Sequence, residues 1–220
     1  MKPIFITGIG TGVGKTLVAA VVATAMGGDY WKPVQAGYEQ GTDSEWLESV
    51  INHHITRIYP EVYKLKFAAS PHIAAEKEGV DISLNTILMR FNEIRNRQGP
   101  SNPPLIIEGA GGLMVPLNNK DFVIDLIERL EATVILVSRN YLGSINHSLL
   151  TALACKSRHL EIGGWIFNDR YLDYEEEIVR WSQIRKIGTL PFSEEPGRDF
   201  VRSQAEILRP LLENIFAKNI

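Results

Sequence analysis

The stretch Gly8–Thr16, with the sequence GIGTGVGKT, constrains the fold of this chain more than any other segment. It follows the apolar run 4–6, and an apolar strand that breaks into glycines and continues as Gly-Lys-Thr is typical of a phosphate-binding loop. The register is unusual, because five residues separate Gly8 from Gly14 where the common pattern has four. The residue that would satisfy that pattern is Ile9. The alternative is a glycine-rich turn without a ligand, but Gly-Lys-Thr between a strand and an apolar helix favours phosphate binding.

Short apolar runs alternate with amphipathic stretches along the chain. Fully apolar strands in a repeated strand–helix order predict a parallel sheet that is covered on both faces. We therefore predict an α/β fold, with one P-loop domain over residues 1–220, a mostly parallel central sheet and helices on both faces. Segment 83–97 is predicted to be a helix with Ser83 as its N-cap, and segment 203–218 a helix interrupted near Pro210. Apolar surroundings place the tryptophans in the predicted core, at positions 31, 46, 165 and 181.

Charge and cysteine usage exclude several classes of protein. The formal net charge is −3, from 23 basic and 26 acidic residues, which gives no reason to expect a nucleic-acid partner or an anionic membrane surface. No apolar run approaches the length of a membrane span, and the first residues carry no secretory signal. We therefore expect a cytoplasmic protein. No Cys/His cluster has zinc spacing, and the single Cys155 is expected to be a packed thiol.

Charged residues at predicted strand ends are the candidates for chemistry. Lys15 could reach outer phosphates while the Thr16 hydroxyl ligates magnesium. Glu108 ends the apolar strand PLIIE, where a carboxylate would emerge at the ligand-binding edge of the sheet. Asp43 is either a second magnesium ligand or the cap of its own helix. Lys32 is either a solvated strand end or a group that stabilises charge during phosphoryl transfer.

Together these segments resemble the dethiobiotin synthetase family. The motifs follow one another in the family's order from Ile6 to about Pro191: GIGTGVGKT, KPVQAG, TDSEWL, SPHIAAEKEG, EGAGGLMVPL, LGSINHSLLT and GGWIFND. The shifted glycine register at Ile9 is itself typical of that family.

The resemblance implies an ATP-dependent cyclo-ligase of biotin biosynthesis. Carbon dioxide forms a carbamate on 7,8-diaminononanoate, ATP converts it to a mixed carbamic-phosphoric anhydride, and the second amine closes the ring of dethiobiotin. ATP is thus a co-substrate, and Mg²⁺ is the implied cofactor.

The resemblance also implies roles for individual residues. Lys15 and Lys32 would steady the carbamate and γ-phosphate charges, with Thr11 beside the reacting groups. Magnesium would be held by Thr16, Asp43 and Glu108. The nucleotide would lie against Gly10, Gly12, Val13, Gly14, Lys15, Thr16, Glu108, Gly111, Asn168 and Pro191, of which Asn168 would contact the purine. The diamine would lie against Lys32, Ala36, Gly143, Ser144, Ile145 and Asn146.

The segment Gly143–Asn146 implies a homodimer. Its free backbone N–H groups at a helix start could receive the substrate's remote carboxylate. From the sequence alone, Ser144 capping its own helix is the commoner role. In the family this segment binds the carboxylate across a two-fold interface, and so the resemblance favours two active sites that each borrow it from the partner chain.

Two residues depart from forms of the family. Gly12 stands where an acidic residue is often found, and Ala36 stands where a serine hydroxyl can contact the substrate region. Gln35 or a water molecule is expected to replace that hydroxyl.

Two other functions compete for the same loop. A glutamine-dependent cobyrinate amide synthase would need a further glutaminase domain. A partitioning or positioning ATPase, a nucleotide-dependent switch, usually carries an extra lysine where this chain has Ile9 and Gly10.

Overall fold

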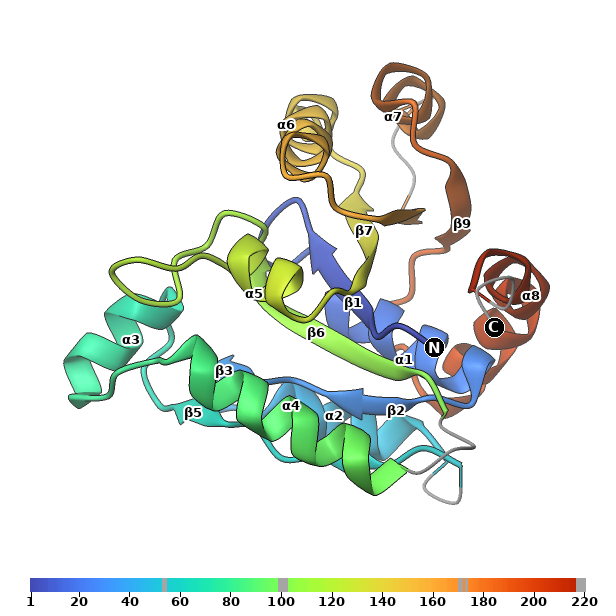
Figure 1. Cartoon of the computed structure of the whole chain (residues 1–220). Helices are drawn as coiled ribbons and strands as arrows, with labels where there is room; N and C mark the ends of the chain where they lie inside the picture. Colours follow the sequence, from blue (N-terminus) through green and yellow to red (C-terminus); the bar gives the residue numbers. More distant parts are fainter. Residues whose placement is uncertain (53–54, 99–102, 170–171, 173, 217–220) are drawn as a thin grey trace.

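Parallel strands form the centre of the molecule in the computed structural model, which describes residues 1–52, 55–98, 103–169, 172 and 174–216 (Figure 1). Within these residues the central sheet has seven strands: β1 (Ile4–Gly8), β2 (Asp29–Trp31), β4 (Ile58–Tyr59), β6 (Leu105–Gly112), β7 (Thr133–Arg139), β8 (Ile162–Asn168) and β9 (Lys186–Leu190). Their order is β4-β2-β6-β1-β7-β8-β9, and each neighbouring pair is parallel. A small parallel pair lies apart from this sheet, β3 (Val34–Ala36) with β5 (Tyr63–Leu65).

Helices cover both faces of the central sheet, as predicted (Figure 1). One face carries α1 (Lys15–Met26), α2 (Asp43–Val50) and α8 (Arg198–Phe216). The other face carries α4 (Leu84–Gln98), α5 (Val123–Arg129), α6 (Ser144–Ser157) and α7 (Tyr174–Ser182). The remaining helix, α3 (Pro71–Glu78), packs against the small β3–β5 pair.

The apolar strands are buried on both sides because their side chains alternate between two cores. Ile4 and Ile6 of β1 pack with α1 and α8, whereas Phe5 between them packs with the opposite layer. All of β1 is buried. A continuous apolar run is therefore the pattern that this position in the sheet requires.

Parallel strands also fix where a site can form. All seven strands deliver their carboxyl ends to one edge of the sheet, and the segments that follow them meet there. The segment after β1 is the predicted phosphate loop, and Lys32 follows β2 directly.

Local predictions for the helices were partly right. Ser83 precedes α4, and its hydroxyl accepts a hydrogen bond from the Thr86 amide at 3.4 Å, as predicted for an N-cap. The predicted interruption near Pro210 was wrong, because α8 runs through it to Phe216; residues 217 and 218 of the predicted segment lie outside the described residues. Pro210 is exposed, so the carbonyl that loses its partner one turn earlier can turn toward water. The buried face of α8 recurs at helical spacing through Val201, Ala205, Leu208 and Leu212.

Two expectations about side chains had different outcomes. Trp31 and Trp165 are fully buried, but Trp181 is 64% exposed and donates to Glu177 on the surface of α7, so its assignment to the core was wrong. Cys155 is buried, and burial raises the pKa of its thiol to about 12, in keeping with a packed thiol.

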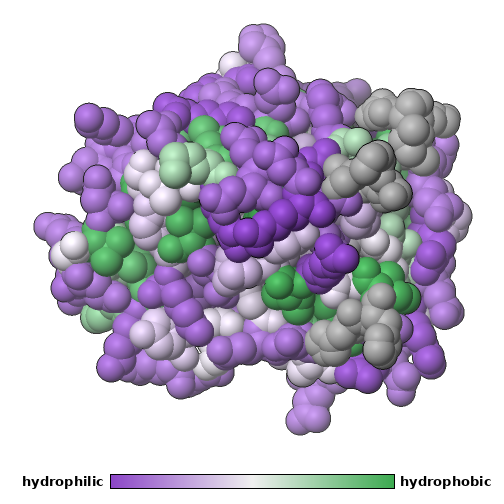
Figure 2. Space-filling view, turned by 60° about the horizontal axis from the view of Figure 1, so that its bottom comes forward, coloured by the Kyte–Doolittle hydropathy of each residue, from purple (hydrophilic) through white to green (hydrophobic). Residues whose placement is uncertain are grey.

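The surface gives two further observations. On the face that Figure 2 brings forward, hydrophobic residues form small patches between hydrophilic ones. Among the described residues, no helix has both the length and the apolar character that crossing a membrane requires.

Candidate active site

The loop between β1 and α1 has the backbone of a phosphate cradle. Gly12 and Gly14 adopt left-handed conformations, with φ of 71° and 86°. A Cβ atom on Gly14 would lie 2.3 Å from the Asn168 amide nitrogen, so this position has room only for glycine. The amide of Ile9 donates to the Val137 carbonyl at 3.0 Å, which ties the start of the loop to β7. The unusual glycine register therefore belongs to a closely fitted turn.

Lys15 begins α1 and folds back over this loop. Its Nζ atom donates to the Gly10 carbonyl at 2.9 Å, and only 7% of the residue is exposed. Burial lowers the pKa of Lys15 to about 8; the nearby Lys32 adds to this effect, while Glu108 and Asp43 oppose it. The Lys15 ammonium is thus held at the loop by a backbone carbonyl, and no carboxylate among the described residues forms an ion pair with it.

Four predicted residues form one hydrogen-bonded cluster beside the loop. The Thr16 hydroxyl lies 2.8 Å from Asp43 Oδ1 and 2.9 Å from Glu108 Oε1. Lys32 donates to Glu108 Oε1 at 2.9 Å and also to Asp43 Oδ2. Segments far apart in the sequence therefore meet at the edge of the sheet, as their strand-end positions predict. A fifth residue, Tyr30, donates its hydroxyl to Glu108 Oε2 at 2.8 Å.

The charges in this cluster compensate one another. Burial disfavours the charged form of Lys32, but Glu108 and Asp43 outweigh it and raise the Lys32 pKa above its ordinary value. Burial likewise disfavours the Asp43 carboxylate, but Lys32 and Thr16 lower the Asp43 pKa overall. Lys32 is therefore a permanent cation at neutral pH, in contrast to Lys15.

The structure separates the two interpretations of Asp43. Thr42 is the N-cap of α2, with a capping box in which its side chain and that of Glu45 bond each other's backbone amides. Asp43 is the first residue inside the helix, and its carboxylate turns away toward Thr16 and Lys32. Capping is thus assigned to Thr42.

The cluster has the donor types that a hard divalent cation prefers. Thr16, Asp43 and Glu108 offer one hydroxyl and two carboxylates within hydrogen-bond distance of one another, and magnesium favours such oxygen ligands. Among the described residues, no group of three or more His, Cys, Asp or Glu side chains gathers as a metal site. A cation held here would therefore depend on the hydroxyl and on water for its remaining ligands.

Two cavities flank the phosphate loop, and Thr11 and Gly12 line both. The smaller, about 750 Å³, contains the cluster. Its lining includes the predicted residues Gly14, Lys15, Thr16, Lys32, Ala36, Asp43, Glu108 and Gly111. The larger, about 1000 Å³, is lined by Gly10, Thr11, Gly12, Val13, Arg139, Asn140, Tyr141, Asp169, Thr189, Pro191 and Phe192. The loop is therefore the shared wall between two chambers.

Asn168, at the end of β8, contacts the backbone of the phosphate loop. Its amide nitrogen donates to the Val13 carbonyl, whereas its Oδ1 atom is buried and has no hydrogen-bond partner among the described residues. The anchored nitrogen fixes the orientation of the amide. Asn168 therefore holds a free acceptor near the loop.

The segment Gly143–Asn146 lines neither cavity of its own chain. Gly143 precedes α6 with φ of 106°, and Ser144 is the first helical residue. The Ser144 hydroxyl is buried and accepts from the Tyr141 amide at 3.3 Å, so the helix-capping alternative for Ser144 is not seen. Exposed leucines continue along the same helix and its preceding loop, at positions 142, 150 and 153.

Sequence reasoning predicted the phosphate-loop residues and Pro191 of the larger cavity but missed the rest of its lining. Arg139 is the last residue of β7 and Asn140 and Tyr141 follow it, while Asp169 and Phe192 come after β8 and β9. A polar cluster directly after an apolar strand was the available signal. Glu175 at the start of α7 accepts hydrogen bonds from Asn140 and Thr189, which both line the cavity. It was not predictable, because these contacts join segments that are distant in the sequence.

Comparisons with known proteins show which sequences this chain is similar to. A family model described as an AAA domain, AAA_26, matches residues 2–198. The ATP-dependent dethiobiotin synthetase BioD of Cytophaga hutchinsonii is 49% identical over 179 residues, which cover 81% of this chain and 82% of the relative. The enzyme of the same name from Christiangramia forsetii is 42% identical over 214 residues, or 96% of this chain and 98% of the relative.

Solved structures share the fold at much lower identity. The MinC:MinD cell division protein complex of Aquifex aeolicus has a TM-score of 0.64 at 15% identity and covers 100% of this chain and 98% of its own. A ParA family ATPase from Chlorobium tepidum has a TM-score of 0.58 at 13% identity, with 97% and 93% covered. At such identities the likeness concerns the fold alone.

Proposed function

The chain belongs to the ATP-dependent dethiobiotin synthetase family, and from this premise we propose how its residues carry out the family's reaction. The enzyme is a cyclo-ligase that uses ATP and carbon dioxide to convert 7,8-diaminononanoate into dethiobiotin. Identity of 42% over nearly the whole chain is the observation that carries this conclusion. The roles of individual residues, magnesium and the dimer are our proposals, and we treat residues 1–220 as one functional domain.

The reaction needs positioning and charge stabilisation rather than a protein nucleophile. One amine adds to carbon dioxide, forming an N–C bond and losing a proton. A carbamate oxygen then attacks the γ-phosphorus while the bond to ADP breaks. Finally, the second amine attacks the carbonyl carbon, phosphate leaves with the former carbamate oxygen, and the amine loses its proton. Negative charge develops on oxygen throughout, so fixed cations lower the barrier.

The lysines supply these cations from two sides. We propose that Lys15 exchanges the Gly10 carbonyl for the γ-phosphate, since its Nζ atom is already over the loop. Lys32 lines the smaller cavity as a permanent cation and would stabilise the carbamate. Thr11 lines both cavities. This supports the proposal that it stands beside the reacting groups, with the phosphate chain in one cavity and the carbamate in the other.

Magnesium fits the oxygen donors of Thr16, Asp43 and Glu108. When bound, it would offset charge on the phosphate oxygens. Lys32 bridges the two carboxylates and Tyr30 donates to Glu108, so these residues hold both carboxylates toward Thr16.

The larger cavity suits the nucleoside of ATP. Pro191 supplies an apolar wall. Asn168 lines neither cavity, and its unpaired Oδ1 atom is buried, so it could accept a hydrogen bond from the adenine amine only if the wall beside it opens. The phosphate chain would run along Gly10, Gly12, Val13 and Gly14 toward Lys15 and Thr16, with Gly111 and Glu108 beyond.

Both departures from the family pattern lie on the lining of the smaller cavity. Gly12 leaves the loop without an acidic side chain, and Ala36 lacks a hydroxyl. Gln35 donates to the Gly37 carbonyl and accepts from the Asp43 amide, so both ends of its amide are engaged. We propose that water, and not Gln35, takes the place of the missing hydroxyl.

A homodimer would complete the diamine site. The exposed residues Leu142, Leu150 and Leu153 beside the start of α6 suit burial against a second chain. Two-fold symmetry would bring Gly143–Asn146 of each chain to the other's smaller cavity, where the backbone N–H groups of Gly143, Ser144, Ile145 and Asn146 could receive the substrate carboxylate.

Mixed dimers test this arrangement. Asn146 is exposed, so Asn146→Trp should block the helix start without disturbing the fold. Lys15→Gln and Asn146→Trp homodimers should each be nearly inactive. After subunit exchange in equal amounts, about a quarter of the normal activity should return, because half of the dimers then hold one intact site. No recovery after proven exchange would refute the shared site.

The remaining proposals concern the location of the enzyme and the classes of partner it binds. We propose a cytoplasmic enzyme that acts on small molecules, without a nucleic-acid or membrane partner, in keeping with its net charge of −3. The MinD and ParA structures share only the fold, so they do not favour a nucleotide-dependent switch.

Product analysis tests the function. The protein should form dethiobiotin, detected by mass, when incubated with ATP, magnesium, bicarbonate and 7,8-diaminononanoate. The Lys15→Gln variant at the same concentration is the matched control and should form little. Correctly folded protein that forms none would contradict the assignment.

A further inference from the structure

Arg139 lies beside the phosphate loop, although it is 131 positions from Gly8 in the sequence. Gly8 of β1 pairs with Val137 of β7, so the strand register carries Arg139 alongside the start of the loop. On its other side Arg139 pairs with Asn168 of β8. Arg139 therefore lines the larger cavity together with Gly10, Thr11, Gly12 and Val13.

One edge of the Arg139 guanidinium is held, and the other is free. Its Nε atom donates to Asp169 Oδ2 at 2.7 Å. No hydrogen bond of its two terminal amino groups is found within the described residues, and 49% of the side chain is exposed. An exposed ion pair of this kind contributes little to stability. Holding Nε does, however, orient the remaining planar N–H groups, which suit phosphate oxygens.

The charged residues around the two cavities show why a further cation would matter for nucleotide binding. Lys15, Lys32 and Arg139 line them, and so do Asp43, Glu108 and Asp169, which makes the side-chain charge zero. Lys32 is committed to two carboxylates. Among the described residues, Arg139 is the one cation on the lining of the larger cavity. A nucleotide's phosphates next to its ribose would therefore have no other cationic side chain in that chamber.

We propose that Arg139 is a nucleotide-binding residue whose terminal amino groups donate hydrogen bonds to the phosphates nearest the ribose of ATP. Asp169 is its positioning residue, because it holds Nε and leaves the opposite edge for the ligand. This inference rests on the proposed function, in which ATP fills the larger cavity. Stacking of the guanidinium on the base is the competing arrangement.

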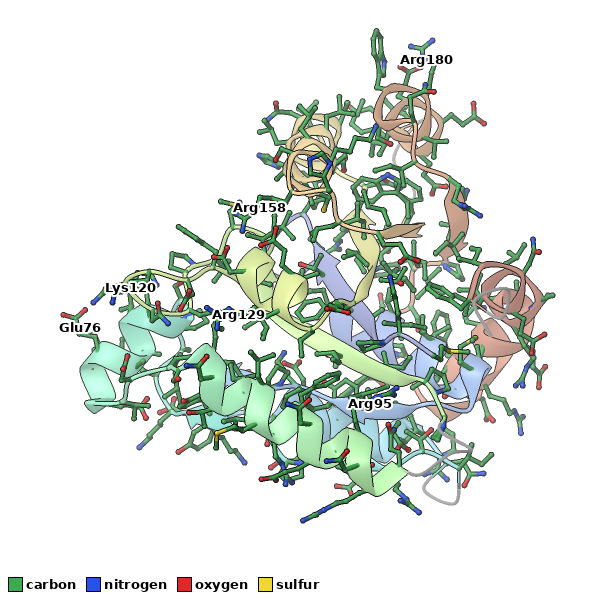
Figure 3. All side chains as sticks on the ribbon, viewed as in Figure 1. Glu76, Arg95, Lys120, Arg129, Arg158 and Arg180 are labelled. Carbon is green, nitrogen blue, oxygen red and sulfur yellow. The ribbon has the colours of Figure 1, made fainter. Side chains whose placement is uncertain are left out.

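Ligands with and without phosphate separate these arrangements. Dissociation constants for ADP and for adenosine are to be measured by calorimetry with the unmodified protein, Arg139→Gln and Arg180→Gln. Arg180 is the matched control, since it also pairs with a carboxylate, that of Glu177, but projects from the side of α7 that faces away from the central sheet (Figure 3). Arg139→Gln should weaken ADP binding about ten- to hundredfold, the usual effect of losing a hydrogen bond between charged groups. Adenosine binding should change less than about threefold, and Arg180→Gln should change neither.

Equal weakening of ADP and adenosine would indicate contact with the base or a general disturbance, and it would overturn the proposal, as would no weakening at all. If Arg139→Gln folds poorly, Arg139→Lys keeps the charge but cannot hold Asp169 and a phosphate together. It should show a smaller loss that is again confined to ADP, and equal losses would overturn the proposal. Failure of the unmodified protein to bind ADP would contradict the proposed function itself.

Discussion

Lys15 makes ATP binding depend on pH in a defined direction. Its side chain is buried, and burial lowers its pKa to about 8. Nucleotide phosphates placed at the loop would favour the charged ammonium and raise that pKa again. Above pH 8 the free protein must therefore take up a proton when it binds nucleotide, and affinity should fall as pH rises.

The size of the effect follows from the lowered Lys15 pKa of about 8. At pH 7 about nine-tenths of free Lys15 is already protonated, whereas at pH 9 only about one-tenth is. The dissociation constant of a non-hydrolysable ATP analogue should therefore rise about tenfold between pH 7 and pH 9, and binding at pH 9 should take up about 0.9 proton. Lys32 does not contribute to this pH dependence, because its pKa is raised and it stays charged over this range.

Calorimetry in two buffers of different ionisation enthalpy measures both quantities. The control is Lys15→Arg, whose guanidinium stays charged at every pH used, so its profile should be flat whatever its absolute affinity. A wild-type profile as flat as that of Lys15→Arg would refute the lowered pKa. A fall in affinity shared by both proteins would assign the titration to another group.

Four further substitutions test the site. Asp43→Asn should raise the magnesium requirement and also lower thermal stability, because the buried Lys32 loses one of its two carboxylate partners. Thr42→Ala should lower the stability by about 1 kcal/mol and leave the magnesium titration unchanged, because Thr42 is the cap. A magnesium titration of Asp43→Asn that matches the unmodified enzyme would argue against a ligand role. Gly14→Ala should abolish nucleotide binding, since its Cβ would lie 2.3 Å from the Asn168 amide nitrogen, and normal binding would show that the loop can yield. Lys15→Gln should lower turnover on the order of 10²–10³-fold while the fold is kept; near-normal turnover would mean that the loop has been misread.

Local patterns predicted the features that depend on local geometry. Buried strands need apolar residues on both faces, and the phosphate loop needs glycine where φ is positive, so both are visible in the sequence. The strand-end positions of Lys32 and Glu108 followed from the rule that parallel strands share one ligand-binding edge. The structure places both beside Thr16.

Features that depend on packing between distant segments were not predictable. Tyr30 reads as an apolar strand residue, and only the neighbouring strand β6 gives its hydroxyl a partner in Glu108. Asp43 and Thr42 are both good caps, and the competition was decided by where Lys32 and Thr16 lie. Arg139 needed the register of β7 against β1 before it could be placed beside the loop. Pro210 did not break α8, because it lies on the solvent side of that helix.

Oxygen transfer is the most direct measurement of the central claim, that ATP activates a carbamate for ring closure. The enzyme is given ATP, magnesium, the diamine and bicarbonate labelled with ¹⁸O, and both products are analysed by mass before the label exchanges with water. The account predicts equal amounts of dethiobiotin and phosphate, with one labelled oxygen in each phosphate, because the leaving phosphate carries the former carbamate oxygen. Phosphate that is unlabelled, or that is released at the same rate without the diamine, would contradict it.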